Sequence, residues 1–260
     1  MLRLNPSGGS MNDAQISQPH FHFRLVPFIV AVLLAYGLPY IATEVVDSAR
    51  HYSHLVPGFA DTLRWTYAQH TVWLLLAVAA IAIAVRVVPA DYGLHAPEEK
   101  SYLLPAVFWG LLFGALMAAI DYAPSLIAHI APKLEASQTA NVPGWLAFNA
   151  LFAGSTEEIP FRALLVTYLA VTMPGKWRVG GFSMNAAGVV AAIIYAFYAA
   201  GFLSAPMLIA LGRFMGQFLL GTLCAYWFEK SKSVLAPIVG HNISSVTEYA
   251  LGLLMIARWA

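Results

Sequence analysis

The stretch Trp73–Ala80, which reads WLLLAVAA, decides the fold class of this chain. It lies within an apolar run near 67–88, in which Arg86 is the only Lys, Arg, Asp or Glu. A helix needs roughly 20 mostly apolar residues to cross a hydrocarbon core about 30 Å thick. Polar and apolar residues do not alternate strictly here, as they would in a strand of a transmembrane barrel. The run therefore predicts a membrane-spanning helix, whose backbone hydrogen bonds are satisfied within one segment.

The same pattern recurs along the rest of the chain. The 260 residues are 60% hydrophobic and 10% charged, and the mean hydropathy of +0.68 is far above that of an ordinary soluble domain. We predict an all-α integral membrane protein, a bundle of about seven transmembrane helices (roughly six to eight) with an intramembrane polar cavity. The predicted spans lie near 24–43, 67–88, 102–121, 143–173, 186–204, 207–228 and 233–257.

Composition divides the chain into a tail and one domain. Residues 1–22 are polar and should form a flexible tail, whereas 23–260 form a polytopic membrane domain. Lys and Arg are more frequent in the tail and in the connections on its side of the membrane, which predicts a cytoplasmic N-terminus. The expected location is the bacterial inner (cytoplasmic) membrane.

Charge and cysteine content exclude a nucleic-acid partner and an intrachain disulfide. The net charge of +1 leaves no basic patch large enough to attract nucleic acid, so no nucleic-acid partner is expected. The single cysteine, Cys224, cannot form an intrachain disulfide and is predicted to be a buried structural thiol.

Ionisable side chains inside the predicted spans mark the candidate sites. Such a group at bilayer depth costs about 2.5 kcal/mol or more on insertion scales, so it normally faces the bundle interior or a wet cavity. The residues concerned are Glu157, Glu158, Arg162, Arg213, His241 and Glu248, with His70 and Asp121 nearer the span ends.

The run Glu157-Glu158-Ile159-Pro160-Phe161-Arg162 is the most heavily charged of these places. Glu158 and Arg162 stand four residues apart on one helix face, so an ion pair can offset much of their burial cost. Glu157 points about 100° away from Glu158 and must meet another helix or a trapped water. Pro160 should kink the helix here. Two interpretations stay open: a buried polar lock between helices, or a carboxylate that activates water.

A second candidate group lies in the last predicted span. His241 stands mid-span, with Asn242 beside it and Ser245 one turn further on. Imidazole, amide and hydroxyl groups in a dry bundle could polarise a carbonyl and stabilise a developing oxyanion. A membrane histidine could equally hydrogen-bond a neighbouring helix or ligate a pigment magnesium or a haem iron.

These residues resemble the CPBP family, the CAAX-protease and bacteriocin-processing proteins that include Rce1-type prenyl-protein endopeptidases and Abi-type proteins. The family signature E-E-x-x-x-R appears as Glu157 to Arg162, and a proline-containing run from Ser233 leads into His241, so the similarity covers about 145–250. The resemblance implies that Glu157 is the base, that Glu158 and Arg162 support it, and that His241 is an oxyanion donor. That mechanism requires no metal and no other cofactor.

The family's middle motif, F-x-x-x-H, lacks its histidine in this chain. Gly201 or Ala199 stands at that position, depending on the register, and no histidine occurs between His129 and His241. In the family this histidine activates water together with the first glutamate. The sequence favours none of the residues that could substitute for it, namely Tyr195, Tyr198 and His129.

The final motif, H-x-x-x-N, is also altered. Ser245 occupies the asparagine position, so the resemblance makes Ser245 the second oxyanion donor beside His241. A hydroxyl still donates a hydrogen bond, but its reach is shorter than that of an amide.

The missing histidine leads us to expect a catalytically degenerate homologue that acts as a binding or assembly subunit of a membrane complex. The alternative is an active glutamic intramembrane endopeptidase that cleaves a prenylated or transmembrane peptide. Expected partners are membrane lipids and either other membrane proteins or such a peptide, and a bound lipid or pigment is left open. The zinc-protease and serine-hydrolase motifs are absent, and Ser155 with His241 makes only an incomplete rhomboid-like pair.

Overall fold

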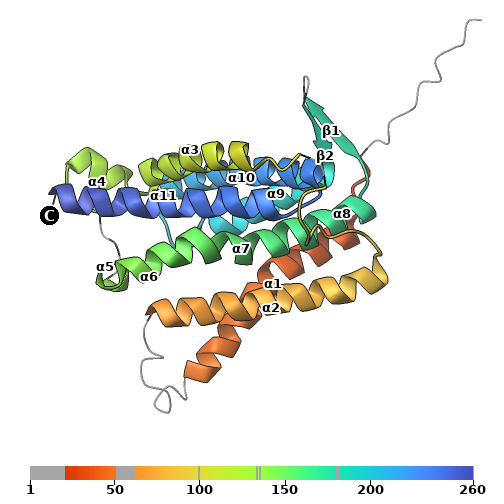
Figure 1. Ribbon diagram of the computed structural model, residues 1–260, viewed down its shortest axis with the longest axis horizontal. Helices are drawn as coiled ribbons and strands as arrows, with labels where there is room; N and C mark the ends of the chain where they lie inside the picture. The colour runs from red at the N-terminus through yellow and green to blue at the C-terminus, as the bar shows by residue number, and fades with distance from the viewer. Residues whose placement is uncertain are drawn as a thin grey trace, which may run out of the picture.

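The computed structural model describes residues 21–50, 62–98, 100–132, 134, 136–179 and 182–259. These residues are nearly all helical, which confirms the predicted fold class (Figure 1). The predicted tail at 1–22 falls almost wholly outside the described residues.

A broken helix in the middle of the chain organises the bundle (Figure 1). The helical hairpin of α1 (Leu25–Arg50) and α2 (Thr62–Val87) packs on one side of it. On the other side, α11 (Leu235–Trp259) contacts the broken helix, α3 (Leu103–Asp121) and α10 (Met207–Ser231). The helix α9 (Ala186–Ala199) contacts both α1 and α10. The segments of the broken helix are α6 (Val142–Ala147), the π-helical η2 (Phe148–Phe152), α7 (Ala153–Glu158), the π-helical η3 (Ile159–Val166) and α8 (Thr167–Thr172).

Helices occupy all the predicted spans within the described part of the chain. By length and composition, Leu25–Ala49 of α1 and the whole of α2, α3 and α10 could each cross a membrane. The helix α9 is apolar but shorter, and α11 is long but carries polar side chains through its middle. The chain is therefore an integral membrane protein. The remaining long helices are α3 (Leu103–Asp121), α9 (Ala186–Ala199), α10 (Met207–Ser231) and α11 (Leu235–Trp259).

Pro160 interrupts the broken helix, as the sequence predicts. Proline lacks an N–H, and its ring clashes with the carbonyl group four residues earlier. The chain widens into the π-helical turn η3 with Pro160 in its first turn, an arrangement that is frequent at functional sites. Because η3 begins directly after Glu158, both glutamates lie where the helix changes its pitch.

Several connections differ from the loops that we expected. The segment after α8 forms a hairpin in which β1 (Lys176–Val179) pairs antiparallel with β2 (Phe182–Asn185). The helix α1 continues to Arg50 and α2 starts at Thr62, so both extend into the predicted 44–66 loop. These ends are polar, so a search for apolar windows misses them. Two short helices, α4 (Ala123–Ala128) and α5 (Ala136–Ala140), lie within the predicted 122–142 loop.

The connection between α2 and α3 is tied to the start of α11. The Val234 N–H donates to the Gly93 carbonyl oxygen over 3.0 Å, and His95 Nε2 lies 2.9 Å from Asp91 Oδ2. Partial burial raises the pKa of Asp91, but hydrogen bonds from the Gly93 N–H and from His95 outweigh it and hold that pKa below its usual value. The same bond with Asp91 raises the pKa of His95. Since this ion pair is exposed, it contributes little to stability.

Small residues allow α3 and α11 to pack closely. A Cβ atom added at Gly110 would lie 2.6 Å from the Gly240 carbonyl oxygen. One added at Gly114 would overlap the Ser244 carbonyl oxygen and lie 2.6 Å from Thr247 Cβ. In membranes, such small-residue contacts replace the hydrophobic driving force between helices. The α3–α11 contact therefore fixes the helix that carries His241.

We expect Gly114→Ala to destabilise the bundle by about 1–3 kcal/mol, because overpacking against rigid backbone forces the helices apart. Gly37→Ala is the matched control: it also lies within a helix, but nothing comes within 4 Å of its added Cβ atom. The measurement is the unfolding free energy of both variants in detergent micelles. Equal stability of the two variants would contradict the close α3–α11 contact.

Candidate functional site

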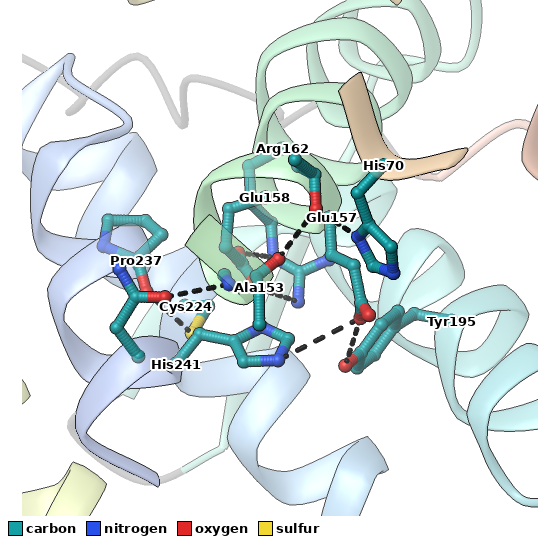
Figure 2. Close-up of polar contacts among 12 residues, drawn as sticks. His70, Ala153, Glu157, Glu158, Arg162, Tyr195, Cys224, Pro237 and His241 are labelled. Atoms are coloured by element: carbon teal, nitrogen blue, oxygen red, sulfur yellow. Dashed lines mark hydrogen bonds and ion pairs between the residues drawn. The ribbon is translucent and has the colours of Figure 1, made fainter. Parts of the chain in front are cut away.

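Glu158, Arg162 and His241 form a buried ionic cluster (Figure 2). Arg162 Nε lies 3.0 Å from Glu158 Oε2, and Arg162 Nη2 donates to Glu158 Oε1 over 3.4 Å. His241 Nδ1 donates to the same Oε1 atom over 2.9 Å. The Glu158 and Arg162 side chains are 1% and 0% exposed. The predicted Glu158–Arg162 pair is thus present, and His241 from α11 joins it.

Glu157 is directed toward two other helices, α9 and α11, as its helical position predicts. Tyr195 of α9 donates its hydroxyl hydrogen to Glu157 Oε2 over 3.0 Å. His241 Nε2 lies 3.7 Å from the same oxygen. The Glu157 side chain is 19% exposed, in contrast to the nearly inaccessible Glu158. The two neighbouring acids therefore differ: Glu158 is enclosed by Arg162 and His241, and Glu157 remains partly accessible.

Tyr195 is held in place from several directions. The helix α9 starts directly after the hairpin, where the Asn185 side chain accepts a hydrogen bond from the Ala187 N–H over 3.0 Å and caps the helix. The Tyr195 ring packs edge-on against Phe161 at 4.8 Å between centroids. The Arg162 guanidinium lies over its face at 5.1 Å, a favourable cation–π contact. Because Phe161 and Arg162 both belong to η3, the helix that carries the E-E-x-x-x-R run also positions Tyr195.

Asn242 and Ser245 differ in how they are used. Asn242 Oδ1 accepts a hydrogen bond from the Gly154 N–H over 2.7 Å, so this residue, which we expected to be a donor near His241, ties α11 to α7. A Cβ atom at Gly154 would lie 2.9 Å from His241 Cβ, so only glycine permits this approach. Ser245 is half-buried one turn beyond His241, and its hydroxyl hydrogen-bonds none of the described residues.

The position of the missing motif histidine lies near the end of α9. Ala199 is the last residue of that helix, and Gly201 follows it with a left-handed φ of 68°. Tyr195 lies one turn before Ala199 on the same face and contacts Glu157. Tyr198 interacts electrostatically with Glu157. His129, the third substitute that we considered, caps α4 and packs edge-on against Trp259 at 6.0 Å instead.

His70 of α2, which the sequence marked only as an ionisable residue near a span end, lies in the surroundings of Glu157. Its ring interacts electrostatically with Glu157 and His241, and Figure 2 shows His70 and Tyr195 on the same side of the cluster as the Glu157 carboxylate. The sequence placed His70 near a span end because the first turns of α2 are polar. In the structure α2 begins at Thr62, so His70 lies inside the helix. The sequence carries no signal that places His70 beside Glu157, because the two residues belong to different helices.

The remaining intramembrane charges form a separate cluster that needs no chemistry. Arg213 of α10 binds Asp121 at the end of α3 in a bidentate manner, with Nε 2.6 Å from Oδ1 and Nη2 3.1 Å from Oδ2. Glu248 of α11 interacts electrostatically with both Asp121 and Arg213. The cluster therefore joins three helices and has the character of a structural lock.

Three other candidates have simple explanations. The Cys224 thiol is buried and points to the Pro237 carbonyl oxygen at 3.9 Å, as expected for a structural thiol. Ser155 donates to the Leu151 carbonyl oxygen over 3.0 Å, while His241 is bound to Glu158, so these two do not form a dyad. Within the described ranges, one group has ligand atoms close enough to hold a metal, and its residues are exposed: Asp91, His95 and Glu98.

The fold and this cluster define an integral membrane protein with paired glutamates, an arginine and a histidine joined in the interior of a helical bundle. Residues 139–247 match the family described as type II CAAX prenyl endopeptidase Rce1-like. Over these residues the chain is therefore identified as Rce1-like within the CPBP family, an intramembrane protease-type homologue. No curated protein and no solved structure matches the chain. The matched region contains Glu157 to Arg162, Tyr195, His241 and Ser245 but not α2 with His70.

Proposed function

We propose that this chain is an active glutamic intramembrane endopeptidase of the CAAX-processing type. The observation that carries the proposal is the separation of the two glutamates. Glu158 is enclosed by Arg162 and His241, whereas Glu157 stays 19% exposed with polar groups from other helices around it. A general base needs a carboxylate that is free to take a proton, and this arrangement supports Glu157 in that role.

The proposed reaction is attack of water on a peptide carbonyl. Glu157 takes one proton from the water as the oxygen–carbon bond forms, and it passes this proton to the leaving amine as the carbon–nitrogen bond breaks. His241 keeps Nδ1 on Glu158, so its Nε2, 3.7 Å from Glu157, is the nitrogen that faces the reacting carbonyl. A protonated His241, with the Ser245 hydroxyl, would stabilise the oxyanion, and its charge together with that of Arg162 would balance those of Glu157 and Glu158.

An apolar groove supports a lipid-bearing or transmembrane substrate. It has a volume of about 580 Å³ and runs along α1, with Gln69 of α2 and Tyr198 of α9 in its wall. Tyr198 also interacts electrostatically with Glu157, which supports access from the groove to the proposed base. The lining suits a prenyl chain or the apolar face of a peptide helix.

The Lys and Arg bias of the connections supports a cytoplasmic N-terminus in a bacterial inner membrane.

A degenerate homologue that acts as a binding or assembly subunit is the second candidate. It is favoured by Tyr195, whose hydroxyl group already donates a hydrogen bond to one carboxylate oxygen of Glu157. In the family a histidine stands near this position. In this role the same cavity would hold a partner helix, a lipid or a pigment without hydrolysis.

Incubation with defined peptides separates the two candidates. Purified protein is given a farnesylated CaaX peptide and apolar transmembrane peptides, and the products are identified by mass spectrometry in water enriched in ¹⁸O. Cleavage with one ¹⁸O atom in the new carboxylate supports the endopeptidase. Absence of cleavage, together with co-purification of a membrane complex in fixed stoichiometry, would overturn it in favour of the subunit.

A further inference from the structure

His70 has an environment that differs from that of a histidine buried only for packing. It projects from α2, which lies outside the region that matches the family. Its ring packs edge-on against Phe148 at 4.9 Å and lies 5.7 Å from Trp73. These aromatic rings hold the imidazole from two sides, so its orientation is fixed.

A hydrogen-bond chain determines which nitrogen of His70 carries the proton. His70 Nδ1 lies 2.6 Å from Thr156 Oγ1, and the Thr156 hydroxyl donates its only hydrogen to the Ala153 carbonyl oxygen over 2.9 Å. A carbonyl oxygen can only accept, so the Thr156 oxygen must accept from His70. Nδ1 therefore bears the hydrogen, and Nε2 of the neutral ring carries a lone pair.

Nε2 of His70 is available for a further contact. Among the residues that the structure describes, none hydrogen-bonds it, and the ring interacts electrostatically with Glu157 and His241. Thr156 directly precedes Glu157 in α7, so the residue that sets the tautomer is rigidly linked to the proposed base. Helices α2, α7 and α11 thus each carry one of the three interacting side chains, His70, Glu157 and His241.

We propose that His70 is the imidazole that orients the attacking water together with Glu157. This inference rests on the proposed endopeptidase function. The water donates one hydrogen to Glu157 and the other to His70 Nε2, which leaves an oxygen lone pair directed at the peptide carbonyl. Glu157 takes the first hydrogen as a proton, and His70 holds the second, which stays on the oxygen until the product carboxylic acid ionises to solvent.

Tyr195 has a different part. It donates its hydroxyl hydrogen to Glu157 Oε2 and so orients the carboxylate. The two residues together replace the missing motif histidine: Tyr195 fixes the base, and His70 supplies the second acceptor that a water needs.

The test compares His70→Ala with His129→Gln in the full-length protein. The substrate is the peptide that the wild type is found to cleave. We expect His70→Ala to lower kcat by about 10²-fold or more, with KM within about twofold of the wild type, and added imidazole to restore part of kcat. His129→Gln alters a histidine that packs on Trp259 and should leave both constants unchanged. Thr156→Val should also lower kcat, because it removes the acceptor that fixes the tautomer.

The outcomes separate this inference from the proposed function. Cleavage by His70→Ala at the wild-type rate would overturn the role of His70 alone. A loss that appears only in KM or in the thermal melting point, without rescue by imidazole, would show that His70 merely packs. Absence of cleavage by the wild type would overturn both proposals, whereas cleavage that is lost in Glu157→Gln but retained in His70→Ala would leave the endopeptidase intact.

Discussion

Replacing Glu157 with glutamine is expected to lower kcat for peptide cleavage by about 10²–10⁴-fold, the usual contribution of a positioned general base. Glutamine has nearly the same shape, and its carbonyl oxygen can still accept the hydrogen bond from Tyr195. It cannot take a proton from water. The local packing should therefore survive while the chemical step is lost. The measurement is the rate of product formation from a farnesylated CaaX peptide, with the melting temperature recorded in parallel.

Glu248→Gln provides a matched control for that variant. Glu248 is also an intramembrane glutamate, but it interacts electrostatically with Asp121 in the separate cluster. The control should cleave at a rate close to that of the wild type. If Glu157→Gln retained full activity, the role of Glu157 as base would be wrong. Loss of activity in both variants to the same degree would point to a general effect of removing buried carboxylates.

The part of the site that follows from local helical geometry could be predicted from the sequence. Glu158 and Arg162 are four residues apart, so their pairing depends only on the helix that contains both. The divergence of Glu157 follows from the same geometry. The disturbance at Pro160 follows from covalent structure, although the length of the π-helical turn depends on packing and could not be predicted.

The contacts between helices could not be predicted in the same way. The partners of Glu157 come from α9 and α11, and their register is set by close approaches such as Gly154 against His241. His70 is the clearest example, since it is 86 positions from Thr156 along the chain. No local pattern links the two residues. A family motif also could not indicate it, because α2 lies outside the matched region.

The ionic cluster has a structural consequence that can be separated from catalysis. We expect Arg162→Met to lower the unfolding free energy by about 3–5 kcal/mol, because removing one partner of a buried ion pair leaves the other charge uncompensated. Glu158 is only 1% exposed and would keep His241 as its sole partner. Arg213→Met is the matched control and should cost less, because the Arg213 side chain is 29% exposed. Unfolding in mixed micelles measures both.

The double variant Glu158→Gln with Arg162→Met should recover most of that stability, because both charges are then removed. A buried ion pair often contributes little compared with neutral groups of similar size, and the glutamine carbonyl can still accept from His241 Nδ1. If the double variant were as unstable as Arg162→Met alone, the loss would come from packing around Arg162, including its contact with Tyr195. A stable double variant that fails to cleave would show that the charges of the pair also serve the reaction beside His241.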